Sequence, residues 1–356
     1  MPSRVKPQKV KREIGERETM PLLDIGYRGW QGERTARWTR SLVLASTGIH
    51  LVWQGVWIKR VLMFAVIPCL IAGVMVAIME QSFEQGGLAR AAQQMQQLEN
   101  SRQGRQMGNP MGINWEKMTS DPDQGRHYAW AFILYNLFRY PQAFGMIVVM
   151  GLVAPRLISY DLRSRGYLLY LSRPLTPGEY IFGKALVLYF LLFMISALPA
   201  LMIYLTGLVL TPDSTAFFQT WDLPLRILLA TTVLMIPTTA VALAFSSVTQ
   251  ESRFAGFAWF ALWVLGAVIY RVLWFASTVD LQMGGGGRPG EVFEGMQNWS
   301  LLKLFSPYET LGYMQQQVFG LTSSDESVWS PWVVALIVSV LGYGVAYWRV
   351  SRVLKA

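Results

Sequence analysis

The chain has 356 residues, of which 53% are hydrophobic and only 15% charged, whereas about 25% of the residues of a typical soluble domain are charged. This composition indicates a membrane protein and argues against a pair of soluble domains of the same total length. A single cysteine, Cys69, excludes a disulfide within the chain and a metal site with several cysteine ligands.

The formal net charge of +9 is one that nucleic-acid-binding proteins also carry. Most of the basic residues, however, flank apolar runs on one side, which is the pattern of a membrane protein and not of a nucleic-acid-binding surface. We therefore expect the lipid bilayer, and no nucleic acid, to be a partner of this chain.

The N-terminal part of the chain is basic and precedes any strong apolar run. Residues 1–40 form a basic extension, and the first such run begins only at Val61, so we do not expect a cleaved signal peptide. Only Lys59 and Arg60 separate the segment 41–60 from that run, too few residues to turn a chain back across a bilayer. We expect 41–60 to be an interfacial amphipathic helix. Its predicted apolar face comprises Leu42, Ala45, Ile49, Val52, Trp53 and Val56.

Spanning helices are predicted from apolar length, since a bilayer requires about 20 mostly apolar residues. The predicted spans are residues 61–79, 132–155, 185–208, 227–248, 254–274 and 331–348. The second is the weakest because it includes Arg139. We expect Arg139 to lie in the outer third of its helix and to extend its head group to the interface.

Lysine and arginine predict the orientation of these spans. Twelve lie in the segment ending at Arg60 and five between Arg156 and Lys184, whereas the longer connection 80–128 carries five basic and six acidic residues. The positive-inside rule then assigns both termini to the cytoplasm. The predicted fold is an all-α polytopic membrane protein with six transmembrane helices, an N-terminal interfacial helix and two extended outer connections, 80–128 and 279–330. Part of the second connection could lie at the interface or dip into it.

One segment has the outline of a phosphate-binding loop, with Gly178 followed by Gly183 and Lys184. Such a loop needs a preceding buried strand and a Ser or Thr after the lysine, but Ala185 follows here. The same residues fit a helix start, with Thr176 as the cap, Pro177 at the first helical position and Glu179 at the third. We expect no catalytic residue, metal site or cofactor in this chain.

The spans hold almost no ionisable residues of the kind that proton or ion relays use. If the protein moves a substrate, the driving force must therefore come from a partner. The densest charged segment on the predicted cytoplasmic side is 159–184, "SYDLRSRGYLLYLSRPLTPGEYIFGK". It is either a topology signal with helix capping or a docking surface.

This segment resembles the permease subunits of ABC-2 type ATP-binding-cassette transporters. The resemblance is carried by Asp161, Gly166, the apolar run 168–171, the Ser-x-Pro-Leu-Thr piece 172–176, Glu179, and Gly183 with Lys184. The six-span layout is similar too.

The resemblance implies a permease subunit that forms a homodimer or heterodimer and exports an amphipathic or lipid-like substrate. Its power would come from a separate cytoplasmic ATPase, which binds ATP and magnesium and docks on the loop 159–184. The candidate docking residues are Asp161, Arg163, Arg165, Gly166, Leu168, Leu171, Arg173, Pro174, Glu179 and Lys184. The expected location is the plasma membrane, specifically a bacterial cytoplasmic (inner) membrane, as a multi-pass protein.

Two other functions stay open on the sequence. The chain could be a membrane scaffold or assembly protein that transports nothing. It could also be a membrane-embedded lipid-modifying enzyme. Such an enzyme would need a polar cluster at one membrane face, and only outer Asp, Glu and His residues, such as Asp121, Asp123 and His127, could supply it. Activity of the purified chain alone would favour the enzyme, and complex formation without ATP-dependent transport would favour the scaffold.

Overall fold

The computed structural model describes residues 39–84, 90, 93, 94, 97, 122–166, 175–211, 215–282, 303–322 and 329–355. The chain divides into two units, Met1–Arg37 and Trp38–Ala356, and all of the described residues belong to the second. The predicted basic extension, 1–40, therefore lies outside them except for Thr39 and Arg40.

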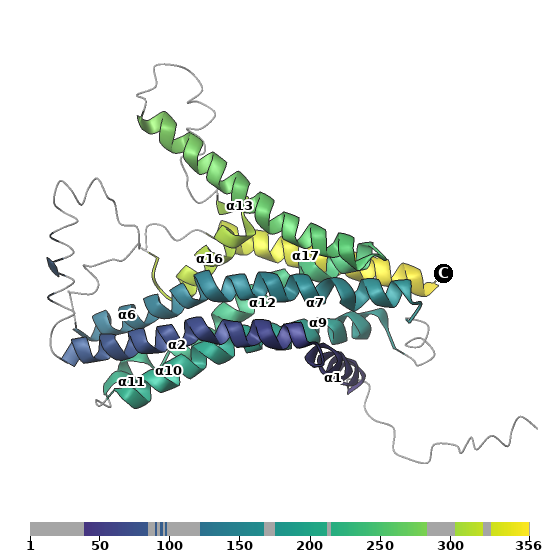
Figure 1. Ribbon diagram of the computed structural model, residues 1–356. Coiled ribbons are helices and arrows are strands. Elements are labelled where there is room, and N and C mark those ends of the chain that lie inside the picture. The colour runs from purple at the N-terminus through teal and green to yellow at the C-terminus, as the bar shows by residue number, and fades with distance from the viewer. Residues whose placement is uncertain are drawn as a thin grey trace, which may run out of the picture. The chain divides into compact units, whose positions relative to one another are not determined.

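Helices make up the described part of the chain, and no strand occurs in it (Figure 1). In chain order they are α1 (Thr39–Trp53), α2 (Val56–Glu84), α6 (Pro122–Leu137), the π-helix η2 (Phe138–Gln142), α7 (Ala143–Arg163), α9 (Pro177–Ile195), α10 (Ala197–Leu210), α11 (Thr215–Thr220), α12 (Leu223–Val248), α13 (Ser252–Gln282), α16 (Pro307–Val318) and α17 (Ser330–Lys355).

Six helical segments within the described residues are long and apolar enough to cross a membrane, which confirms the predicted all-α polytopic fold. They are Val56–Gln81, Gln124–Arg163, Pro177–Leu210, Thr215–Val248, Ser252–Ala276 and Ser330–Val353. Each contains one of the predicted apolar segments but extends beyond it. Apolar length marks only the part of a helix that needs lipid, whereas the backbone hydrogen bonds continue through polar residues at both ends.

The interfacial helix differs from its prediction in length and in its buried face. α1 ends at Trp53, and a break at Gln54 and Gly55 separates it from α2, so residues 56–60 belong to the first spanning helix. Of the predicted apolar face, Ala45 is buried and Ile49 and Val52 pack against the core, whereas Leu42, Trp53 and Val56 are exposed. Ser41, outside that face, is buried as well. The cause is the contact with α9: a β-carbon on Gly48 would lie 2.6 Å from Val187, so this small residue faces the neighbouring helix.

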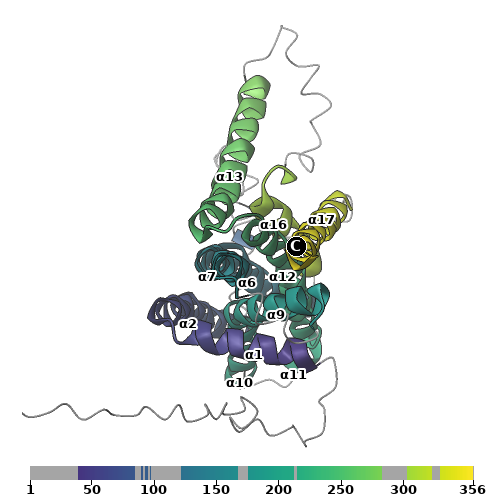
Figure 2. The same cartoon turned by 90° about the vertical axis from the view of Figure 1, so that its right-hand side faces the viewer.

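The helix α12 is the centre of the bundle. It contacts α7, α9, α10, α13, α16 and α17 (Figure 2). Two clusters of buried apolar side chains lie along it. One joins α1, α7, α9 and the C-terminal half of α17 and includes Leu243 of α12. The other joins α2, α6, α10 and α16 and includes Ile227 of α12. We call the two ends of the bundle the α1 end and the α11 end, each after a helix that lies there (Figure 1).

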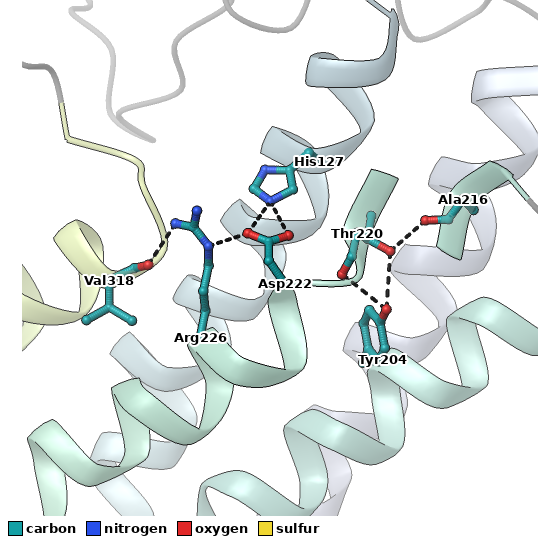
Figure 3. A network of polar contacts seen from close by, with 7 residues as sticks. All are labelled: His127, Tyr204, Ala216, Thr220, Asp222, Arg226 and Val318. Carbon is teal, nitrogen blue, oxygen red and sulfur yellow. Dashed lines mark hydrogen bonds and ion pairs between the residues drawn. The ribbon is translucent and has the colours of Figure 1, made fainter. Parts of the chain in front are cut away.

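Polar ties at the α11 end connect helices that are distant in sequence (Figure 3). His127 of α6 bonds to Asp222 at 3.0 Å, and Asp222 also accepts from Arg226 at 2.5 Å. Arg226 donates a further hydrogen bond to the carbonyl oxygen of Val318 at the end of α16. Asp222 and Arg226 are therefore joined to α6 and α16, and this network fixes the start of α12.

A second polar cluster at this end joins α2, α6 and α11. Glu80 is 3% exposed, accepts a hydrogen bond from the indole of Trp130, and pairs with Arg126 at 3.3 Å. Arg126 also donates to Gln219. A carboxylate this deeply buried persists only with such partners.

The sequence predicted that Arg139 extends its head group to the membrane interface, but in the structure the side chain is held between helices. It lies in the π-helix η2, is 11% exposed, and pairs with Glu309 of α16 at 2.6 Å. Its guanidinium donates to the carbonyl oxygen of Tyr308 and lies 3.7 Å over the Tyr308 ring. Gly312 makes room for it, because a β-carbon there would be 2.3 Å from the guanidinium. The guanidinium of Arg139 therefore holds α16, which lies within the second predicted outer connection. Because Glu309 belongs to another helix, the spacing of residues around Arg139 could not reveal this partner.

Close packing of α12 against α17 depends on Gly342. A β-carbon at this position would lie 2.7 Å from the backbone of Ala240, which cannot move aside as a long side chain can, whereas one at Gly344 would meet nothing within 4 Å. We predict that Gly342→Ala separates the two helices and destabilises the protein by about 1–3 kcal/mol, the usual cost of overpacking. The matched variant Gly344→Ala should leave stability unchanged or slightly higher. Thermal unfolding in detergent measures both, and equal melting temperatures would contradict the prediction.

Candidate functional site

The candidate site is the segment between α7 and α9 at the α1 end, and its first part is the end of α7. Ser164 is the C-terminal cap of α7, and Arg165 follows in the left-handed region with φ of 52°. The backbone N–H of Gly166 then donates to the carbonyl oxygen of Asp161 at 3.0 Å. This turn closes the helix and leaves Arg163 and Arg165 exposed.

The second part is the start of α9, and the predicted helix start is confirmed. Thr176 caps the helix, Pro177 stands in its first turn, and Glu179 completes a reciprocal capping box by accepting from the backbone of Thr176 at 2.8 Å. Lys184 then follows two turns into the same helix. The predicted docking residues Leu168, Leu171, Arg173 and Pro174 lie outside the described residues.

A buried ion pair joins the two parts. The ammonium group of Lys184 lies 2.8 Å from a carboxylate oxygen of Asp161, and the two side chains are 9% and 14% exposed. The hydroxyl of Tyr180 donates to the same carboxylate at 2.6 Å. Asp161 and Lys184 were both predicted as docking residues, and the structure brings them together inside the protein. They fix the distance between the end of α7 and the start of α9.

The helix α1 is attached to the same place. The hydroxyl of Ser41 donates to the carbonyl oxygen of Glu179 at 3.1 Å. A β-carbon on Gly183 would be 2.7 Å from Leu44, so α1 and α9 pack with little space between them. The interfacial helix and the loop therefore form one surface, which we call the coupling surface: α1, residues 161–166 and residues 175–184.

The exposed part of this surface is basic. Arg163 pairs with Glu251, at the start of α13, at 3.2 Å, with side chains 65% and 46% exposed. An ion pair this exposed contributes little to stability and is readily exchanged for another partner. Arg163 and Arg165 are thus available to a partner, while Asp161 and Lys184 are not.

A polar joint next to the coupling surface was missed by the sequence analysis. Ser246 of α12 accepts hydrogen bonds from the backbone N–H groups of Ile158 and Ser159 and donates to the carbonyl oxygen of Pro155. Ser159 in turn donates to the carbonyl oxygen of Ser246 at 2.7 Å. A proline removes a helical hydrogen bond, so Pro155 was the one sign in the sequence that a backbone group of this helix needs a partner from elsewhere. Its partner, 91 residues away, could not be found without the fold.

We predict that Asp161→Asn or Lys184→Met each destabilises the protein by about 3 kcal/mol, because each leaves one buried charge without its partner. The double variant should recover part of that loss, since neither charge remains. Glu251→Gln, which breaks the exposed pair with Arg163, is the control and should cost under about 1 kcal/mol. Chemical unfolding of the four variants gives the coupling energy, and strictly additive effects of Asp161→Asn and Lys184→Met would show that the pair contributes nothing.

Comparison with known proteins assigns the chain to a family. Residues 54–353 match the family described as "ABC-2 family transporter protein", a stretch that begins just before α2 and reaches into the last turn of α17. It therefore includes all six candidate spans and the described coupling surface except α1. The chain matches no curated protein. This chain belongs to the ABC-2 family and is a transmembrane permease subunit of an ATP-binding-cassette transporter.

Proposed function

We propose that this permease is driven by a separate cytoplasmic ATPase that docks on the coupling surface, and that it exports an amphipathic or lipid-like substrate. ATP and magnesium bind in that ATPase. The permease works in the cytoplasmic membrane as a dimer, either with a second copy of itself or with a second permease subunit. The observation that carries the proposal is the Asp161–Lys184 pair, which joins the end of α7 to the start of α9.

The distribution of charge supports a cytoplasmic position for the α1 end. Basic residues are concentrated there: Arg40, Lys59, Arg60, Arg156, Arg163, Arg165, Lys184, Arg253, Arg349 and Arg352. The described acidic residues at that end are Asp161, Glu179 and Glu251. A surplus of arginine and lysine marks the cytoplasmic side of a membrane protein. A basic surface also suits an acidic face on the ATPase, because complementary charges steer and orient association.

The residues of the coupling surface divide into two roles. Asp161, Tyr180 and Lys184 are buried together and position the loop, while Arg163 and Arg165 are exposed and available for contact. If the loop were not held at its ends, a force on it would bend the loop and would not move the spanning helices. Since both ends of this loop are fixed to spanning helices, displacement of the loop moves α7 and α9.

The joint between Ser159 and Ser246 extends this path to the centre of the bundle. It lies within one turn of Asp161 and links α7 to α12, the helix that contacts most of its neighbours. ATP-driven closure of the ATPase would therefore shift α7, α9 and α12 together. Such shifts between two packings of the same helices are a common switching mechanism.

The nature of the spans favours an amphipathic substrate. Buried ion pairs within the described bundle join Arg139 with Glu309 and Arg126 with Glu80. They leave a largely apolar bundle with polar groups near its ends, which suits a cargo that is partly apolar itself.

We predict that the double charge reversal Arg163→Glu and Arg165→Glu weakens binding of the ATPase at least tenfold, about 1.4 kcal/mol or more, because like charges would then face each other. Arg352→Glu is the matched control: it reverses an exposed arginine at the same end, on α17 and outside the coupling surface, and should bind normally. Co-purification from native membranes followed by titration in nanodiscs measures the affinity. Unchanged binding in the double variant, with unchanged melting temperature, would refute docking at this loop.

A further inference from the structure

A cavity of about 500 Å³ lies between α12, α13, α16 and α17. This volume lies within the range of small-molecule sites, about 300–1,000 Å³. Its walls are almost entirely apolar, with Val241 and Phe245 from α12, Trp259 and Trp263 from α13, and Val338 and Leu341 from α17. It lies inside a single subunit and away from the coupling surface, so neither docking nor the known family membership accounts for it.

A small polar gap lies beside the cavity and shares two of its lining residues. Trp263 and Leu311 also line a gap of about 10 Å³, together with Arg139 and Gln315. The indole N–H of Trp263 and the amide Nε2 of Gln315 are buried and have no hydrogen-bond partner among the described residues. The two residues are only 6% and 2% exposed. The neighbouring Trp259, by contrast, donates its indole N–H to the carbonyl oxygen of Ile147 at 2.9 Å.

These two groups are both donors, so what they lack is an acceptor. A buried donor without a partner is unfavourable, and native proteins satisfy almost all such groups. The guanidinium of Arg139 already has Glu309 and Tyr308, so an anion is not required to balance its charge. A single oxygen atom would fit the gap, since a volume of 10–15 Å³ is about what one water needs.

The other side of the cavity faces the lipid. Leu341 of α17 is 62% exposed and Phe305, just before α16, is 53% exposed. In a chain that spans the bilayer, apolar side chains exposed at this depth contact the acyl chains of lipids. The cavity is thus open to the hydrocarbon of the membrane, and through Trp263 it borders the gap that holds the two unpartnered donors.

We propose that this cavity binds a single-chain amphiphile taken from the bilayer. The acyl chain lies between α13 and α17, and an oxygen acceptor of its head group, a carboxylate or an ester carbonyl, accepts from Trp263. The acyl chain alone would fill the cavity but leave the two donors unsatisfied, and water alone would satisfy the donors but leave the apolar cavity unfilled. A molecule with both parts matches both features. The inference is independent of the proposed ATPase docking and concerns binding by the permease alone.

Photo-crosslinking of the permease in nanodiscs with a diazirine-bearing palmitic acid tests this directly. Adducts should be concentrated on peptides covering Pro237–Phe245 and Val334–Val345. They should be competed by palmitic acid and by 1-palmitoyl-lysophosphatidylcholine at least fivefold more effectively than by hexadecane, which has no acceptor. Stronger competition by one of the first two identifies the head group. Equal competition by hexadecane would overturn the role of the donors.

Two pairs of variants sharpen the test. Val338→Trp fills the cavity and should reduce the adducts at least fivefold, while Val340→Trp, on the exposed side of the same helix, should leave them unchanged. Trp263→Phe keeps the ring but removes the donor and should weaken palmitate binding about threefold to tenfold, as expected for one hydrogen bond. Trp274→Phe, on the same helix α13 but outside the cavity, is its control and should not weaken palmitate binding. Adducts spread evenly over the lipid-facing helices, or equal labelling of the two tryptophan-insertion variants at matched melting temperature, would overturn the proposal.

Discussion

A polar group inside this bundle needs a partner in the chain or in a bound molecule, because the surrounding hydrocarbon offers none. Arg139 meets this constraint through Glu309 and Tyr308, and Lys184 meets it through Asp161. Each pair joins segments that are far apart in the sequence. The few polar groups of the spans thus act as fixed points between helices, and the apolar side chains fill the space between those points.

The positions of these fixed points explain why the two ends of the bundle differ. At the α11 end, ties such as Glu80–Arg126 and His127–Asp222 join α2, α6, α11 and α12. At the α1 end, the buried pair of Asp161 and Lys184 joins the two ends of one loop. The exposed residues next to this pair, Arg163 and Arg165, are basic. The first arrangement holds helices together. The second holds a surface in place while leaving it accessible, which is what a docking site for a cytoplasmic ATPase requires.

The sequence predicted the features that depend on neighbouring residues. Apolar length located all six spans, and the Thr176-Pro177-Glu179 pattern located the start of α9 and its cap. It could not predict features that depend on a second segment. Arg139 was expected at the interface because its partner is 170 residues away, and the packing of Ser41 and Gly48 beside the predicted Ala45 depends on α9, which lies against α1. Among the predicted docking residues, no local pattern separates buried Asp161 and Lys184 from exposed Arg163 and Arg165.

The continuous helix from α6 through η2 to α7 connects the features of this protein that matter for transport. Its C-terminal end is held at the coupling surface by Asp161, and Ser159, two residues earlier, joins it to α12. About 22 residues further back, roughly 33 Å along a helix, Arg139 holds α16. The same α16 supplies part of the wall of the apolar cavity. If the ATPase docks at the coupling surface as proposed, a displacement of the loop would be carried along this helix to the α16 anchor, and so to the wall of the cavity.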